Sequence, residues 1–255
     1  MPMYCGIGGI RKEIKNLYTG IGGVRKDITE MWAGNAGVKK QIFSSAKLLG
    51  DMPVGSEVYL TESGSPELYI IVNQGLPSSK YDSSCDGTWL LRKFIFDSMA
   101  WNSWSWNTWY NTSSINKYLN NTFVERFSAY AINNLFMSPK IPIYSRGDIQ
   151  DYDAQVFLLS AYELDLTSNI FIPAEGSAMQ YFDGAEANKR IAYFGGAPAI
   201  WWSRSMHQKD TDSAWCVSTT GNLSNLRSTT HVGIRPAIIL KKDTMVSSDG
   251  SIVEG

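Results

Sequence analysis

The stretch that decides the fold is WWSRSMHQKDTDSAWCVSTTGNLSNLRSTTHVGIRPAIIL, residues 201–240. It begins with two large, rigid tryptophans. It ends with the turn residue Gly233 and an apolar run to Leu240 that is typical of a buried strand. The 29 residues between these ends, 203–231, include 11 serines or threonines and both histidines of the chain. A polar, turn-rich insert between apolar segments is typical of an adaptable contact surface. This stretch therefore predicts a binding protein, and it indicates no reaction mechanism.

The composition is that of a globular chain without a strong charge. Its 255 residues are enough for one large domain, or for one domain with a small appendage. Hydrophobic residues make up 44% and the net charge is -1, so no global field attracts the protein to nucleic acid or to acidic membranes. Charged residues are only 18%, whereas aromatic residues, serine, asparagine and threonine are plentiful. This mixture favours sheets, loops and recognition surfaces, with no nucleic-acid partner.

The three cysteines, Cys5, Cys85 and Cys216, have no C-x-x-C spacing, which argues against a zinc ribbon or a redox motif. We interpret them as free thiols of a protein assembled in a reducing compartment. The start, MPMYCGIGG, lacks the basic and apolar segments of a signal peptide, so we expect none. No apolar stretch approaches the roughly 18 residues that cross a bilayer, so we expect no membrane insertion.

The N-terminal region repeats with a period of 14 residues. GIGGIRKEIKNLYT, residues 6–19, is followed by GIGGVRKDITEMWA and then by GNAGVKKQIF. The apolar spacing fits either a helix or a strand, and the short glycine-bounded units favour strands. Because so small a repeat buries no core alone, we expect residues 1–45 to attach to a particle, to sister chains or to the main domain. A simple linker is the alternative.

The main domain is expected from residue 52 to residue 242. Residues 54–60 and 68–72 alternate around a turn and predict a hairpin, and residues 89–91 predict a short buried run. Four tryptophans between residues 101 and 109 are either an aromatic contact surface or a packing face.

Two helices and one further strand are expected later in the domain. The first helix begins at Ser113 or Ser114, and the second covers residues 129–136 before two prolines. Residues 155–160 predict a buried strand, and residues 165–195 are rich in loops.

Six segments in chain order resemble the C-type-lectin-like domain of unknown function found in phages and prophages of gut Firmicutes. They are residues 84–93, 110–115, 118–123, 156–160, 201–205 and 233–237. The resemblance implies an α+β fold with a mixed, mostly antiparallel sheet and two helices over residues 52–242, and a C-terminal tail at 243–255. The N-terminal repeats also resemble those of phage tail-associated proteins. The fold is similar to that of variable proteins made by diversity-generating retroelements, which implies a variable-type region at about 200–236.

The candidate ligand-binding residues lie in that region, because rigid aromatics with adaptable polar neighbours make good contact surfaces. They are Ser203, Met206, His207, Lys209, Asp210, Asp212, Trp215, Asn222, Ser224, Asn225, Arg227, Thr229 and His231. Trp104 and Trp106 are further aromatic candidates. The framework residues are expected to be Trp201, Trp202, Arg204, Gly233, Arg235 and Pro236. A buried arginine needs a carboxylate or carbonyl partner, which the sequence does not name.

Catalytic and metal functions have little support. Formylglycine-generating enzymes resemble one another in a late cysteine pair, and here only Cys216 lies in the corresponding region. The two histidines with Asp210 or Asp212 lack any standard metal-ligand spacing, and the calcium motifs of true C-type lectins are absent from the sequence. We therefore expect no catalytic residue, no metal and no cofactor.

Together these features predict a phage tail-associated receptor-binding protein located in the virion and made in the host cytoplasm. Its partners would be a host-surface glycan or protein and other tail proteins, and a homotrimer is favoured by analogy. The main alternative is a structural tail or decoration protein without a host ligand. An enzyme of the formylglycine-generating type is the second alternative.

Overall fold

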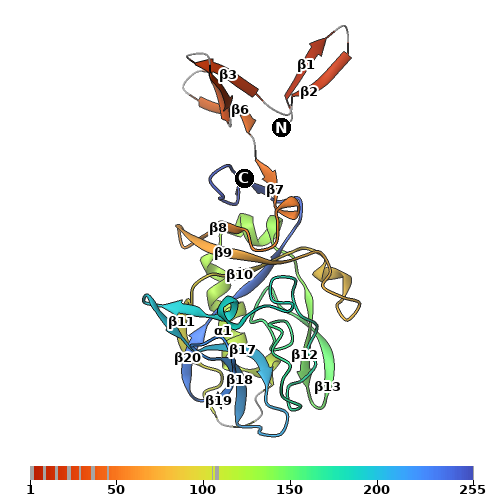
Figure 1. The fold of residues 1–255 in the computed structure, drawn as a ribbon, viewed down its shortest axis with the longest axis vertical. Helices are drawn as coiled ribbons and strands as arrows, with labels where there is room; N and C mark the ends of the chain where they lie inside the picture. Colours follow the sequence, from red (N-terminus) through yellow and green to blue (C-terminus); the bar gives the residue numbers. More distant parts are fainter. Residues whose placement is uncertain are drawn as a thin grey trace.

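Two five-stranded sheets form the body of the protein (Figure 1). The computed structural model describes residues 46–104, 106 and 109–254, and the backbone of residues 3–7, 10–14, 17–21, 24–28, 30–35 and 38–44. The first sheet is antiparallel, with the strand order β14 (Val156–Phe157), β21 (Ala237–Leu240), β10 (Thr88–Arg92), β9 (Ser65–Gln74) and β8 (Glu57–Glu62). The second has the order β11 (Asp97–Ala100), β20 (His231–Ile234), β17 (Trp201–Met206), β18 (Ser213–Val217) and β19 (Leu223–Arg227). Within it, β17 and β20 are parallel.

Smaller antiparallel pairs complete the domain. They are β12 (Lys140–Ser145) with β13 (Asp148–Asp153), β15 (Ala192–Phe194) with β16 (Ala197–Ala199), and β7 (Lys47–Leu48) with β22 (Met245–Val246). Short helical turns occur at η1 (Leu49–Asp51), η2 (Ser83–Cys85), η3 (Tyr110–Thr112) and η7 (Ala187–Arg190).

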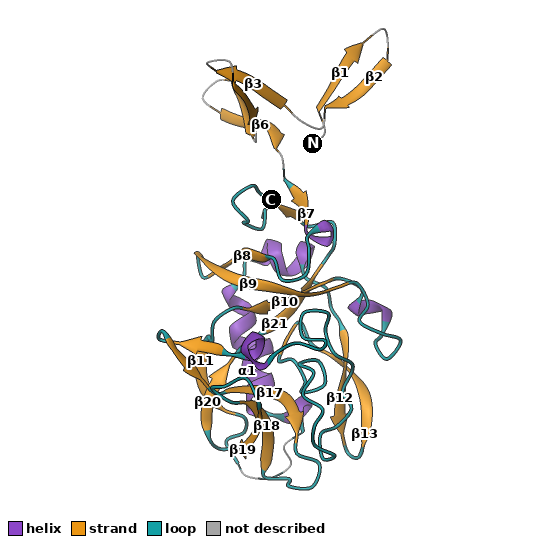
Figure 2. Ribbon diagram, viewed as in Figure 1, coloured by secondary structure: helices purple, strands orange, loops and turns teal. Residues whose placement is uncertain are grey.

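The expected α+β class with two helices is wrong, because strand strongly predominates over helix in the described residues (Figure 2). One helical run of 13 residues exists, made of α1 (Ser114–Tyr118), η4 (Leu119–Phe123) and η5 (Val124–Arg126). It begins as expected, since the Ser113 hydroxyl accepts a hydrogen bond from the Asn116 amide at 3.1 Å. The second expected helix shrinks to one π-helical turn, η6 (Ala131–Leu135). Its two central asparagines have low helix propensity, and Pro139 follows.

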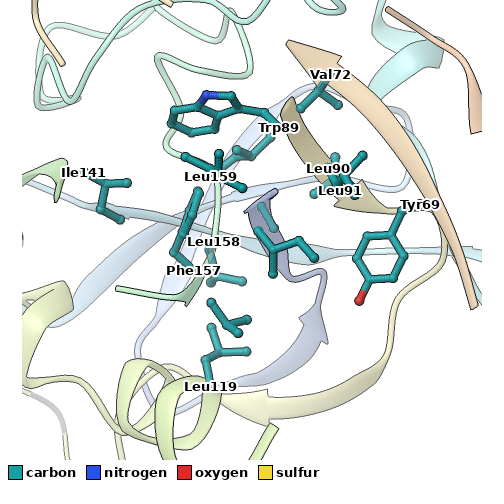
Figure 3. Close-up of a cluster of buried hydrophobic side chains, with 14 of the residues drawn as sticks. Tyr69, Val72, Trp89, Leu90, Leu91, Leu119, Ile141, Phe157, Leu158 and Leu159 are labelled. Carbon is teal, nitrogen blue, oxygen red and sulfur yellow. The ribbon is translucent and has the colours of Figure 1, made fainter. Parts of the chain in front are cut away.

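The predicted hairpin and the buried run at residues 89–91 are confirmed and contribute to the core (Figure 3), whereas the strand predicted at residues 155–160 shortens to β14. β8 pairs with β9, and its residues alternate between exposed and buried. Every residue of β10 is buried, because this strand lies between β21 and β9. Trp89 of β10 packs edge-on against Phe157 and Tyr81, each at 5.5 Å between ring centroids. Burial of large aromatic side chains stabilises the first sheet together with the aliphatic residues around them.

The segment expected to be a tail, residues 243–255, instead packs on the start of the domain. β22 pairs with β7, and the Tyr59 backbone exchanges hydrogen bonds of 2.8 Å with Gly250 and Ile252. Val246 and Ile252 are buried. The domain therefore extends from about residue 46 to residue 254, beyond both expected boundaries.

The N-terminal repeats form antiparallel strand pairs, as the strand interpretation predicted. The strands are β1 (Met3–Ile7), β2 (Ile10–Ile14), β3 (Leu17–Ile21), β4 (Val24–Ile28), β5 (Glu30–Asn35) and β6 (Val38–Ser44), paired in sequence order. The 14-residue period is visible in the register, where Gly6, Gly20 and Gly34 lie opposite a basic residue of the next strand. Figure 1 shows these strands beyond β7, at the end of the molecule away from β19.

Candidate ligand-binding surface

The two tryptophans at the start of β17 are framework residues, as expected. Both side chains are fully buried. The indole N–H groups of Trp201 and Trp202 donate to the carbonyls of Arg190 and Met99, each at 3.0 Å. Trp202 also packs edge-on against Trp101 at 5.9 Å. Because their polar atoms are satisfied and their rings are enclosed, these residues fix β17 to two distant segments of the chain.

Arg204 is held by the partner that the sequence did not identify. Its guanidinium is fully buried and forms a two-pronged ion pair with Glu163, with 2.6 Å between Nη2 and Oε1. It also donates to the carbonyls of Pro142 and Leu158. Because Glu163 is 41 residues away in the chain, no local pattern indicates this pair. Such a pair is costly to break, since removing one side leaves a buried charge.

A second buried carboxylate, Glu175, lies in the same network. It accepts hydrogen bonds from the Tyr144 amide at 2.7 Å and from the Ser205 hydroxyl. Burial raises its pKa from 4.5 to about 7, and the positive charge of Arg204 only partly opposes this increase.

Arg235 is buried as well, but its surroundings differ. Its guanidinium stacks over the Trp201 ring at 5.0 Å, and its Nε donates to the Arg92 carbonyl at 2.8 Å. Within the described part of the chain it forms no ion pair. Burial lowers its pKa to about 10. Its neighbours Gly233 and Pro236 are buried framework positions, as expected.

Three of the expected ligand-binding residues are not on the surface. Ser203, Met206 and Trp215 are at most 4% exposed. β17 lies between β20 and β18 and all of its residues are buried, and the Ser203 hydroxyl donates to the Trp215 carbonyl at 2.9 Å. These positions support the surface and are unavailable for direct contact.

The remaining candidates do form one surface, which we call the polar surface. Those that are exposed are Lys209, Asp210, Asp212, Asn222, Asn225, Arg227, Thr229 and His231, and His207 and Ser224 are half-buried. They lie on the loop between β17 and β18, in the turn between β18 and β19, on β19, and from the turn after β19 to the start of β20. Asn225 and Arg227 lie directly opposite Trp215 and Ser213 across the strand pair, and the Ser228 amide donates to the Asp212 carbonyl at 2.7 Å. The surface therefore combines the edge strand of the second sheet with a loop tied to it.

An aromatic stack supports the loop of the polar surface. The His207 ring stacks on Trp215 at 4.7 Å and lies 5.6 Å from Phe171, whose ring also has the Lys209 ammonium 5.3 Å from its centroid. The His207 Nδ1 accepts the Asp210 amide at 2.9 Å, and burial lowers the pKa of this histidine. His207 therefore acts as a neutral support for the loop. Phe171 was missed because it lies in a loop-rich segment without a periodic pattern.

The tryptophan-rich segment is divided between the core and the surface. Trp101 is fully buried, whereas Trp104 and Trp106 are 44% and 70% exposed. The Ser228 hydroxyl donates to the Trp104 carbonyl at 3.4 Å, which joins this segment to the turn after β19. Both expected uses, core packing and aromatic exposure, therefore occur within one short segment.

A cavity of about 760 Å³ shares no lining residue with the polar surface and was not expected from the sequence. It is bounded by the end of β10, residues 93–96 and residues 188–196, and Arg235 lines it. Its lining combines residues from distant parts of the chain, so no local motif indicates it.

The geometry bears on two chemical roles, a nucleophilic Cys216 and a metal site. Cys216 is buried on β18, and burial raises its pKa to about 12, so its thiol is not an activated nucleophile. Among the residues with described side chains, no group of three or more histidine, cysteine or acidic side chains is placed to hold a metal ion.

Fold and surface together define a mostly β domain that presents a polar surface at one end. Residues 86–242 match the family described as a domain of unknown function, DUF6273. This match covers more than half of the chain, and the protein belongs to that family. Comparisons with curated proteins and with solved structures gave no match. None of the helices in the described residues has the length and apolar character needed to cross a membrane.

Proposed function

We propose that the protein is a receptor-binding protein of a phage tail, and that its polar surface contacts a host-surface glycan or protein. The observation that carries this proposal is the separation of two groups of residues within one stretch. Trp201, Trp202 and Arg204 are fully buried, whereas the charged and amide side chains after them are exposed on a loop and an edge strand. A rigid framework beneath an adaptable polar surface is the arrangement that recognition surfaces use.

The side chains of the polar surface are suited to binding different partners. Lys209 and Arg227 are positive, Asp210 and Asp212 are negative, and Asn225 offers both a donor and an acceptor. Their exposure means that substitutions change the contact chemistry with little effect on the core. This supports the further proposal that the stretch is a target of a diversity-generating retroelement. Sequencing the 3′ end of the gene across a phage population tests it: adenine-specific scatter is expected, and a uniform sequence would overturn it.

The N-terminal strand pairs fit the attachment role proposed for residues 1–45. Several copies on one particle would multiply weak individual contacts, because linked binding sites raise the effective concentration. A full-length chain and a chain lacking residues 1–45 would be compared for incorporation into particles. Incorporation of both to the same extent would overturn the attachment role.

Host-cell binding by the full chain tests the main proposal. Asn225→Ala with Arg227→Ala should reduce binding of fluorescently labelled protein to host cells, with an unchanged melting temperature. Gln150→Ala with Lys47→Ala is the matched control, since both residues are exposed on elements outside the polar surface. Equal binding by the two double variants would refute the recognition role of the surface.

The rival functions predict different results. A structural tail or decoration protein would show no binding to host cells even in multivalent form. An enzyme of the formylglycine-generating type would lose activity in Cys216→Ala, which should leave adhesion unchanged. The buried position and raised pKa of Cys216 argue against such a role for this thiol.

A further inference from the structure

The cavity of about 760 Å³ shares no residue with the polar surface. Its size is in the range of clefts that hold small molecules. A shallower hollow of about 310 Å³ continues from Ile95 and Phe194 to His231, at the margin of the polar surface. The cavity is therefore a separate concave site, and it does not depend on the function proposed above.

Arg235 is the unusual residue of the cavity. Its side chain is 1% exposed, and its Nη1 has no hydrogen-bond partner among the residues that the structure describes. A buried guanidinium without a carboxylate partner destabilises the fold, because the charge loses its hydration and the unpaired N–H loses its acceptor. Arg204 shows the alternative within the same domain, where the Glu163 carboxylate and two backbone carbonyls accept its hydrogen bonds.

Two other cationic side chains at the cavity are paired with carboxylates, whereas Arg235 and Lys189 form no ion pair within the described residues. Lys93 pairs with Glu57 at 2.8 Å, and Arg92 pairs with Glu62 and with Glu67 at 2.9 and 2.6 Å. Lys189 also lines the cavity, and its ammonium lies 4.9 Å from the Tyr181 ring centroid.

Aromatic side chains form the rest of the wall. Tyr193 and Phe194, on the β15–β16 pair, are 42% and 47% exposed, and Phe94 is 41% exposed. The Ile95 amide donates to the Tyr193 carbonyl at 3.1 Å, which fixes this pair beside the cavity. Exposed aromatic faces beside a concave site offer flat apolar surfaces for a ring.

We propose that this cavity binds a sugar acid, with the carboxylate on Arg235 and the sugar ring against Tyr193 and Phe194. The planar fork of a guanidinium matches a carboxylate in two-pronged geometry, and the bond is assisted by charge. At the rim, the Asn188 amide donates to Glu186 at 3.2 Å and the Lys189 ammonium donates to the Tyr181 carbonyl at 3.3 Å, and each has further hydrogens to donate to ring hydroxyls. The cavity volume accommodates a monosaccharide or a disaccharide.

Titration of the full chain with glucuronate, followed by isothermal calorimetry and by thermal shift, tests the proposal. Glucose is the neutral matched ligand, and we expect it to bind at least about 10-fold more weakly, because a charged hydrogen bond is lost. Arg235→Met should weaken glucuronate binding by about 10-fold or more while it leaves the melting temperature equal or higher. Lys47→Met, which removes an exposed lysine outside the cavity, should bind glucuronate as the unchanged protein does.

Phe194→Ala keeps the test decisive if Arg235→Met does not fold, because this side chain is 47% exposed and its removal leaves the core intact. It should weaken glucuronate binding in a protein with an unchanged melting temperature. Equal binding of glucuronate and glucose, or no glucuronate binding at millimolar concentration, would overturn the proposal. Binding of benzoate without glucuronate would overturn the assignment to a sugar. Host-cell adhesion by the Asn225 and Arg227 variants is a separate readout, so the two proposals fail independently.

Discussion

Glu175 makes the stability of this protein depend on pH in a direction opposite to that of most carboxylates. Burial raises its pKa from 4.5 to about 7, so the folded state holds the proton more tightly than the unfolded state does. Between pH 4.5 and 7 the unfolded chain releases this proton first, and the free energy of unfolding falls as the pH rises. The stabilisation that protonated Glu175 contributes to the folded state is complete below pH 4.5 and is lost by about pH 8. A shift of this size corresponds to about 3 kcal/mol, since each pKa unit represents about 1.4 kcal/mol.

Glu175→Gln isolates this contribution. The amide resembles the protonated acid, because its carbonyl oxygen can accept the Tyr144 amide and its N–H can donate to the Ser205 hydroxyl. The variant should match the unchanged protein near pH 4.5 and exceed it by up to about 3 kcal/mol at pH 8.

Guanidinium unfolding of both proteins at pH 4.5, 6, 7 and 8 measures the difference. Subtracting the free energies of unfolding of the two proteins at each pH cancels the opposite contribution of His207, whose lowered pKa makes acidification destabilising. Glu125→Gln is the control, because Glu125 is an exposed carboxylate. A difference between Glu175→Gln and the unchanged protein that stays constant from pH 4.5 to pH 8 would refute the reasoning.

Two further predictions concern the framework and the thiols. Trp202→Ala should lower the free energy of unfolding by about 3–5 kcal/mol, because it leaves a cavity at a fully buried site. Asn225→Ala should change it by less than about 0.5 kcal/mol. Chemical unfolding measures both, and equal losses would contradict the division between framework and surface. In a Cys5→Ser background, Cys85 and Cys216 should resist a disulfide reagent at pH 8 until the chain unfolds, since burial raises both pKa values to about 12. Labelling of the folded protein would contradict their burial.

Much of the framework was predictable because its signals are local. The alternation of β8, the apolar run of β10 and the run that ends at Leu240 all form the strands that their patterns indicate. The cap at Ser113 also lies where a hydroxyl precedes a helical pattern. The prediction of the second helix was wrong because the helix propensity of its residues is weak.

The surface was only partly predictable, because composition does not tell which way a residue faces. Ser203 and Met206 belong to a polar stretch, yet every residue of β17 is buried, so the alternation that would have distinguished inward from outward positions is absent. The pairing of Arg204 with Glu163 and the cavity at Arg235 both depend on residues far apart in the chain. Such contacts arise from the tertiary fold, and one sequence contains no local pattern for them.

The two buried arginines differ as framework and functional residues differ. Arg204 has acceptors for its charge on Glu163 and on two backbone carbonyls, so its burial is compensated within the domain. Arg235 has one carbonyl and the face of Trp201, and none of the described side chains or backbone groups accepts a hydrogen bond from its Nη1. Uncompensated burial of a charge reduces stability, and features that reduce stability concentrate at functional sites. The two arginines lie in the same part of the chain, one on β17 and one just before β21, so their different surroundings come from their positions in the fold. The unpaired Nη1 of Arg235 is therefore the physical reason to expect an external acceptor in the cavity that this residue lines.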